Sequence, residues 1–251
     1  MTRPLNERIA FITGGSRGIG RAIALKLAAA GCHVAIVYHN SHEEAEEVCS
    51  SIRDMGRRAM AIQADVSEPD SLLEAFTLFR ERFDRVDIVV SNAALGVLKP
   101  ALELTRKHWR RCLETNALAL NVLAQQAVPL MTNGGRILAL SSLGASRAIP
   151  HYAFIGASKA AMESVARSLA QELGPRGIRV NVVSAGVVDT DALRHFPNRE
   201  QLLAEYADRA PAGPVLTAED VAGAVYLLCL PEAAMITGHT LVVDGGFSIS
   251  G

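Results

Sequence analysis

The sequence predicts an α/β protein with a single doubly wound parallel sheet of about seven strands, covered by helices on both faces. Short apolar runs bounded by turn residues alternate with helix-period segments along the whole chain. Of the 251 residues 49% are hydrophobic but only 5% aromatic, so Ala, Val, Leu and Ile must fill most of the core, as in parallel sheets buried on both faces. Because no charge run, low-complexity tract or linker interrupts the alternation, we expect one domain over residues 1–251.

The strands are predicted from the apolar runs, taken in chain order. They read RIAFIT at 8–13, HVAIVY at 33–38, RAMAIQ at 58–63, DIVVS at 87–91, RILALS at 136–141, RVNVVS at 179–184 and LVV at 241–243. Helix-period segments between them predict helices at 18–30, 42–55, 69–83, 107–131, 156–173 and 218–230. Crossovers between parallel strands are right-handed, so successive helices can cover both faces of the sheet.

One segment interrupts this rhythm. Residues 189–214 are polar and contain several prolines, with an amphipathic stretch at 200–206. A long insertion after a strand often forms a lid over a binding site. We therefore expect a substrate lid here; an ordinary surface excursion is the alternative.

Charge and cysteine usage narrow the classes of function. The formal net charge of −1 gives no electrostatic reason to expect nucleic acid or an anionic membrane as partner. No apolar run is long enough to span a bilayer, and the first seven residues lack a signal core. The four cysteines are scattered without metal-ligand spacing, so we expect buried thiols, no metal and a cytoplasmic location.

A glycine-rich turn lies directly after the first predicted strand and opens a helix. Residues 13–20 read TGGSRGIG, with the spacing G-x-x-x-G-x-G. Glycines let the backbone approach a pyrophosphate, whose charge is favoured by free N–H groups at the start of a helix. The candidate cofactor-binding residues in this turn are Gly14, Ser16, Arg17, Gly18, Ile19 and Gly20.

The end of the second strand predicts which dinucleotide is used. Enzymes that prefer NAD commonly place a carboxylate there, but residues 38–42 read YHNSH, with no carboxylate before Glu43. Arg17 can face a ribose 2′-phosphate, and Ser41 can add a hydrogen bond. We therefore predict NADP(H); a solvated Arg17 in a site indifferent to the phosphate is the alternative.

Several motifs together resemble the short-chain dehydrogenase/reductase family, over nearly the whole chain. In order, they are the glycine-rich turn, Asp65-Val66, Ser91-Asn92-Ala93-Ala94, Asn116, Ser141-Ser142 and Lys159. The resemblance implies a Rossmann-type fold, a homotetramer and further cofactor contacts. By this resemblance Asp65 and Val66 would hold the adenine, Asn92 and Ala93 would line the cofactor near the ribose, and Lys159 would bind the nicotinamide ribose. Thr190 would meet the nicotinamide carboxamide or the pyrophosphate, and Gly186 is a further cofactor-binding candidate.

The chain differs from the family at the position of the residue that usually acts as the catalytic acid. A Tyr normally lies four residues before the Lys; here that residue is Ile155, and the nearest phenol is Tyr152, seven residues before Lys159. Three features resemble those of enoyl-acyl carrier protein reductases. They are this Tyr–Lys spacing, the ending Ala93-Ala94 of the motif that begins at Ser91, and the run at 143–150. The closest resemblance is to the NADPH-dependent type III enzymes of bacteria.

The displaced phenol suits an enoyl thioester. Residues four apart on a helix lie about 6 Å apart along the axis, and residues seven apart about 10.5 Å. Hydride transfer to the β-carbon of an enoyl thioester develops charge on an oxygen several bonds away. An acid that lies further from the Lys than in a ketone reductase therefore suits this substrate. We expect Tyr152 to hydrogen-bond the enolate oxygen and Lys159 to ease proton donation, with solvent then protonating the α-carbon.

Two catalytic candidates have more than one interpretation. Ser142 stands where ketone-reducing relatives keep their catalytic Ser, and it either assists the substrate oxygen or caps the strand end. Asn116 falls within a predicted helix, where Asn is unfavourable, and by the resemblance would shape the active-site helix and a water relay.

Alternative functions and partners also stay open. They are a short-chain carbonyl or 3-ketoacyl reductase, a reductase of CoA esters in a specialised pathway, and a non-catalytic NADP-binding regulator. The expected substrate is an enoyl thioester on acyl carrier protein. A basic cluster of Lys107, Arg110 and Arg111 could dock this acidic carrier, or be a solvated helix face.

Overall fold

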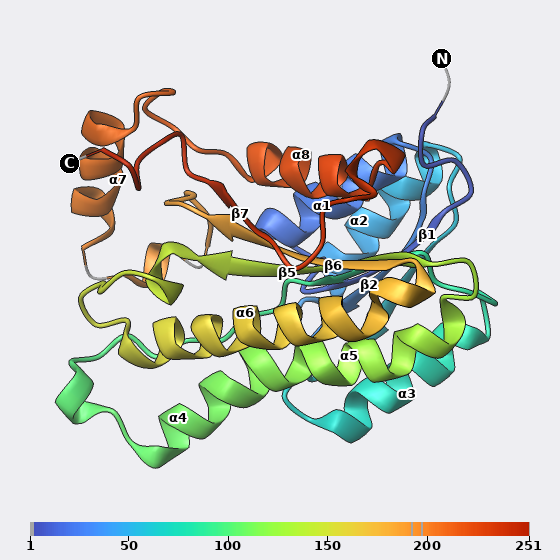
Figure 1. Ribbon diagram of the computed structural model, residues 1–251, viewed down its shortest axis with the longest axis horizontal. Coiled ribbons are helices and arrows are strands. Elements are labelled where there is room, and N and C mark those ends of the chain that lie inside the picture. The colour runs from blue at the N-terminus through green and yellow to red at the C-terminus, as the bar shows by residue number, and fades with distance from the viewer. Residues whose placement is uncertain (1–2, 192, 197, 251) are drawn as a thin grey trace.

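A seven-stranded parallel sheet forms the centre of the molecule in the computed structural model, which describes residues 3–191, 193–196 and 198–250 (Figure 1). Its strand order is β3-β2-β1-β4-β5-β6-β7. The strands are β1 (Ile9–Thr13), β2 (His33–Tyr38), β3 (Ala59–Gln63), β4 (Ile88–Ser91), β5 (Gly135–Ser142), β6 (Ile178–Ala185) and β7 (Thr240–Val243). The predicted fold class and all seven predicted strands are confirmed, with shifts of at most one residue at their ends.

Helices cover both faces of this sheet, as predicted. One face carries α1 (Gly18–Ala29), α2 (His42–Asp54) and α8 (Ala218–Cys229) (Figure 1). The other face carries α3 (Pro69–Arg80), α4 (Arg106–Leu113), α5 (Ala119–Ala127) and α6 (Ala153–Leu173). The chain reverses its direction of winding between β3 and β4, so that β1 lies between β2 and β4, and this switch point opens a crevice at the carboxyl ends of the strands.

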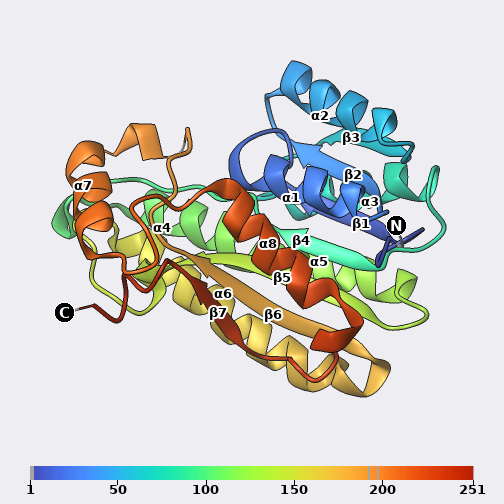
Figure 2. The same cartoon turned by 90° about the horizontal axis from the view of Figure 1, so that it is seen from above.

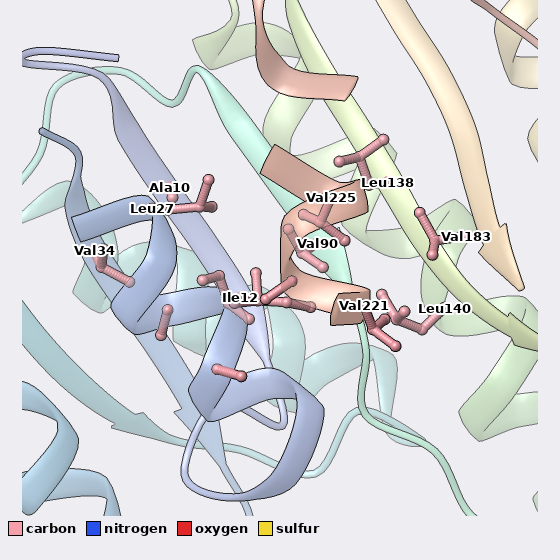
Figure 3. Close-up of a cluster of buried hydrophobic side chains, with 14 of the residues drawn as sticks. Ala10, Ile12, Leu27, Val34, Val90, Leu138, Leu140, Val183, Val221 and Val225 are labelled. Atoms are coloured by element: carbon pink, nitrogen blue, oxygen red, sulfur yellow. The ribbon is translucent and has the colours of Figure 1, made fainter. Parts of the chain in front are cut away.

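The core has two layers because successive strand residues point to opposite faces. Ile12 packs with α1 and α8, in the layer that includes Leu27, Val221 and Val225 (Figure 3). Phe11, its neighbour in sequence, packs in the other layer, where its ring stacks on Phe76 at 4.4 Å between centroids. Both faces of β1 are fully buried, which explains why it reads as a continuous apolar run.

The prediction of one continuous helix at 107–131 is wrong. The structure divides it into α4, a π-helical turn at Glu114–Leu118, α5 and a final 3₁₀ turn at Val128–Leu130. A π-helical turn widens the helix by one residue, and such turns often mark functional sites. Here it accommodates the tertiary hydrogen bonds of Asn116, which a periodicity argument cannot anticipate.

Two further segments define the region around the site. Helix α6 (Ala153–Leu173) begins three residues before its predicted start, and Tyr152 is its N-cap residue. The polar segment after β6 contains α7 (Arg199–Arg209), which lies beside the C-terminal tail at the carboxyl ends of the strands (Figures 1 and 2). Buried Tyr206 anchors α7, because its ring stacks on Phe247 at 5.6 Å.

In the part of the chain that the structure describes, no helix is both long enough and apolar enough to cross a lipid bilayer.

Candidate active site at the carboxyl ends of the strands

A cavity of about 570 Å³ lies at the carboxyl ends of the strands, beside the switch point between β1 and β4. Every cofactor-binding candidate from the sequence lines it, together with Ser142 and Tyr152. These candidates are Gly14, Ser16, Arg17, Gly18, Ile19, Gly20, Ser41, Asp65, Val66, Asn92, Ala93, Lys159, Gly186 and Thr190. Residues that are far apart in the sequence are therefore gathered in one site.

The glycine-rich turn forms one wall of this cavity. Gly14 and Gly18 have φ angles of +65° and +53°, which side-chain-bearing residues rarely adopt. A Cβ atom on Gly20 would lie 2.1 Å from the carbonyl oxygen of Gly14, so the turn closes only without a side chain there. The Asn92 amide donates to the carbonyl oxygens of Thr13 and Gly14, at 2.9 and 3.0 Å, and braces the turn from the end of β4.

The start of α1 points free backbone N–H groups at this wall. Its N-cap residue, Arg17, makes no side-chain capping hydrogen bond, and the first turn contains no acidic residue. The helix dipole and the uncapped N–H groups together favour an anion. The turn therefore fits a pyrophosphate.

The other side of the switch point carries polar and basic groups. Asp65 accepts hydrogen bonds from the backbone N–H and hydroxyl of Ser67, at 2.9 and 2.7 Å. Burial raises the pKa of Asp65, but these hydrogen bonds and the nearby His39 and Arg111 outweigh that effect, so the pKa lies below its ordinary value. The carboxylate is therefore ionised and held as a hydrogen-bond acceptor beside the cavity.

Some lining residues were missed by sequence reasoning. His39, Asn40, Ser67, Arg111 and Thr115 line the cavity as well. His39 and Asn40 precede Ser41 and could have been included with it on that ground. Arg111 could not, because its position on α4 relative to β3 depends on tertiary packing; the sequence placed it in a docking cluster or on a solvated face.

At the opposite end of the cavity lie the proposed catalytic groups. The hydroxyls of Tyr152 and Ser142 are 3.1 Å apart, and either can be the donor. Loss of solvation raises the pKa of Tyr152, and the hydrogen bond with Ser142 opposes this change. Ser142 makes no capping hydrogen bond to the following turn, so its side chain is engaged with the displaced phenol.

Lys159 is buried at the base of this end. Its ammonium group donates to the carbonyl oxygen of Leu140 at 2.7 Å. Burial lowers the pKa of Lys159 to about 8, an effect that the carboxylate of Glu163, one helical turn further along α6, partly opposes. The carboxylate in turn accepts a hydrogen bond from Ser141 at 2.6 Å.

Asn116 lies behind the cavity and does not line it. Its amide donates to the carbonyl oxygen of Leu95 at 2.9 Å and to the hydroxyl of Ser158 at 2.8 Å, and its own oxygen accepts from the Leu95 N–H at 2.9 Å. The residue thus joins the segment after β4 to the start of α6. This geometry is that of a support for the site, with the π-helical turn placing the amide.

Apolar side chains line the cavity together with Tyr152. They are Leu95, Leu143, Ile149, Leu193, Phe196 and Leu202. The ring of Phe196 lies 6.0 Å from that of Tyr152, measured between centroids. Three of these residues come from the segment after β6, so part of the expected lid lines the cavity, with Phe196 next to the phenol.

Comparisons with known proteins agree with this geometry. The family model described as enoyl-(acyl carrier protein) reductase matches residues 14–248. The chain is 41% identical to a 1-cyclohexenylcarbonyl-CoA reductase of Streptomyces collinus, over 97% of this chain and 88% of that protein. It is 35% identical to a hydroxynaphthalene reductase-like protein of Metarhizium majus, over 97% and 96% of the two chains.

Solved structures give the same result. A short-chain dehydrogenase from Burkholderia cenocepacia, crystallised in complex with NADP, superposes with a TM-score of 0.90 at 38% identity, over 98% of this chain and 99% of that one. The strand order, the glycine-rich turn and the placement of Lys159 are consistent with these matches. The chain therefore belongs to the short-chain dehydrogenase/reductase family and is an oxidoreductase.

Proposed function

We propose that this protein reduces the C2–C3 double bond of an enoyl thioester with NADPH. The observation that carries the proposal is the Tyr152–Ser142 pair, 3.1 Å apart in a cavity whose usual acid position is held by Ile155. The similarity to a reductase of 1-cyclohexenylcarbonyl-CoA supports the same reaction class. Coenzyme A and acyl carrier protein are both thioester carriers that such a site can serve.

The cofactor assignment rests on the fit of the cavity. Gly14, Gly20 and the start of α1 form a cradle for a pyrophosphate, and Arg17 and Ser41 line the cavity where a ribose phosphate would lie. No carboxylate follows β2 before Glu43. The structural relative from Burkholderia was crystallised with NADP, which supports the same cofactor here.

The bound cofactor supplies the hydride for the β-carbon. The residues of this chain then stabilise the charge that develops on the thioester oxygen. Within the hydrogen-bonded pair of Tyr152 and Ser142 one hydroxyl donates to the other, which leaves one O–H of the pair to donate to the substrate oxygen. A preorganised donor of this kind contributes about 3 kcal/mol at the transition state. The ammonium group of Lys159, which donates a hydrogen bond to the Leu140 carbonyl oxygen of β5, adds positive potential beneath the pair.

The apolar end of the cavity suggests which acyl groups are accepted. Leu95, Ile149 and Phe196 line the same cavity as the phenol, so an alkyl or alicyclic chain would displace water there and gain hydrophobic free energy. A charged or strongly polar acyl group would lose its hydration without gaining partners.

A second candidate is reduction of a carbonyl group. It is favoured by Ser142, which occupies the position of the catalytic Ser of ketone-reducing relatives, and by the similarity to hydroxynaphthalene reductase-like proteins. A non-catalytic NADP-binding regulator is the third, because Ile155 cannot donate a proton. Turnover distinguishes all three.

The test measures NADPH oxidation with crotonyl-, trans-2-octenoyl- and 1-cyclohexenylcarbonyl-CoA against acetoacetyl-CoA, and then with the carrier-protein thioesters. We expect turnover of the enoyl substrates and a fall in kcat of about 10²–10³-fold in Tyr152→Phe, with NADPH affinity unchanged. Tyr226→Phe, on α8 outside the cavity, is the matched control. A preference for acetoacetyl-CoA would refute the enoyl assignment, and NADPH binding without turnover of any substrate would favour the regulator.

A further inference from the structure

The ring of Tyr152 lies in a narrow space that exists because residue 144 is a glycine. A Cβ atom on Gly144 would lie 2.5 Å from both Cδ1 and Cε1 of the Tyr152 ring. It would also approach the side chain of Ile149 at 3.4 Å. Contacts below 3.0 Å essentially never occur for real Cβ atoms, so a side chain at 144 and the present position of the ring exclude each other.

The backbone does not require glycine at this position. Gly144 lies in the 3₁₀ turn at Leu143–Ala145 and is not among the glycines with positive φ. An alanine could therefore adopt the same backbone conformation without strain. The free space beside the ring is the structural reason for the glycine.

Gly156 brings the same turn against the start of α6. A Cβ atom on Gly156 would lie 2.4 Å from the carbonyl oxygen of Gly144. Inside a helix, glycine is less favourable than alanine by about 1 kcal/mol, so Gly156 is unfavourable for α6 itself. The close approach it permits places the first residue before α6, Tyr152, opposite the end of β5, where Ser142 lies.

A third glycine, Gly96, packs against Ile155, the residue that stands in the position of the usual acid. A Cβ atom on Gly96 would lie 2.2 Å from Cδ1 of Ile155, and Ile155 is buried. The position four residues before Lys159 is thus occupied by a packed apolar side chain, while the phenol is held in a separate space. Gly96 thus makes room for Ile155, and Gly144 makes room for the ring of Tyr152.

We propose that Gly144, supported by Gly156, is a positioning residue that holds the phenol of Tyr152 against Ser142. This inference rests on the proposed function for its kinetic consequence, but the steric relation itself does not depend on the substrate. A side chain at 144 displaces the ring from Ser142 and moves its hydroxyl relative to the substrate oxygen.

The test is the kinetics of Gly144→Ala, Tyr152→Phe and the double variant, with Gly223→Ala as the control. Gly223 lies in α8 with open space where a Cβ would be, so its substitution should leave kcat unchanged. Misplacing a reacting group by about 1 Å can reduce the rate about 100-fold, and we expect a fall in kcat of this order in Gly144→Ala with KM for NADPH unchanged. In the Tyr152→Phe background the same substitution should change kcat less than about twofold, because the group it displaces no longer acts.

An equal loss of kcat from Gly144→Ala in both backgrounds, or no loss in either, would overturn the proposal. A stability measurement covers the case in which Gly144→Ala is too unstable to assay. Removing the ring with Tyr152→Ala should then restore part of the lost thermal stability, and failure of that rescue would equally overturn it. Should the wild type reduce none of the thioesters, the proposed function fails, while this rescue still decides whether Gly144 makes room for the ring.

Discussion

The burial of Lys159 allows a quantitative prediction of stability against pH. Its ammonium group lies beneath the cavity and donates to the Leu140 carbonyl at 2.7 Å. Burial lowers its pKa from the ordinary 10.5 to about 8, with the charge of Glu163 opposing the change. The folded protein therefore holds this proton less tightly than the unfolded chain does.

The sign of the effect follows from this order of the two pKa values. Below pH 8 Lys159 is charged in both states, and burying its charge costs the folded protein free energy. The cost decreases as pH rises from about 8 to 10.5 and disappears above that range. With about 1.4 kcal/mol for each pKa unit, the full cost is about 3 kcal/mol.

The perturbation that measures this cost is Lys159→Met, which keeps an unbranched side chain shorter by only one heavy atom and removes its charge. Unfolding by guanidinium chloride, without cofactor, gives the free energy of unfolding of both proteins at about pH 7 and about pH 10. Between these values wild type should gain about 2–3 kcal/mol relative to the variant. Lys107→Met, at an exposed lysine on α4, should show no such relative gain. Parallel changes in wild type and Lys159→Met would refute the reasoning, because the folded state would then hold the Lys159 proton normally.

Three further predictions concern the cofactor site and its support. Gly20→Ala should abolish NADPH binding and lower Tm, because its Cβ would lie 2.1 Å from the Gly14 carbonyl oxygen; fluorescence titration showing wild-type affinity would contradict this. Arg17→Ala should weaken NADPH binding about 10–100-fold, the value of a charge-assisted hydrogen bond, and NADH binding much less; equal losses for the two cofactors in calorimetry would exclude a 2′-phosphate contact. Asn116→Ala should lower the free energy of unfolding by about 2–4 kcal/mol in urea titrations, because the Leu95 backbone groups lose their partner; a change under about 1 kcal/mol would mean that water replaces the amide.

The fold was predictable because its signals are local. A strand buried on both faces must be apolar throughout, as β1 and β2 are, and the periodicity of the segments between strands is that of helices. The glycine-rich turn was recognisable for the same reason, since the conformations of Gly14 and Gly18 favour glycine at those positions.

The boundaries that failed depend on contacts made across the molecule. The long helix predicted at 107–131 contains a π-helical turn because Asn116 reaches Leu95 and Ser158, residues far from it in sequence. The place of Arg111 beside Asp65 likewise depends on how α4 packs against the sheet. Neither contact leaves a periodic signal.

By itself the sequence determined the parallel α/β fold, the glycine-rich turn, and the exchange of the usual acid for Ile155 with Tyr152 further out. Only the tertiary structure decided where that phenol lies. The distance of 3.1 Å between Tyr152 and Ser142 results from the approach of the turn after β5 to the start of α6, which Gly144 and Gly156 permit. Sequence spacing gives distances along one element, whereas the position of a catalytic group depends on packing between elements.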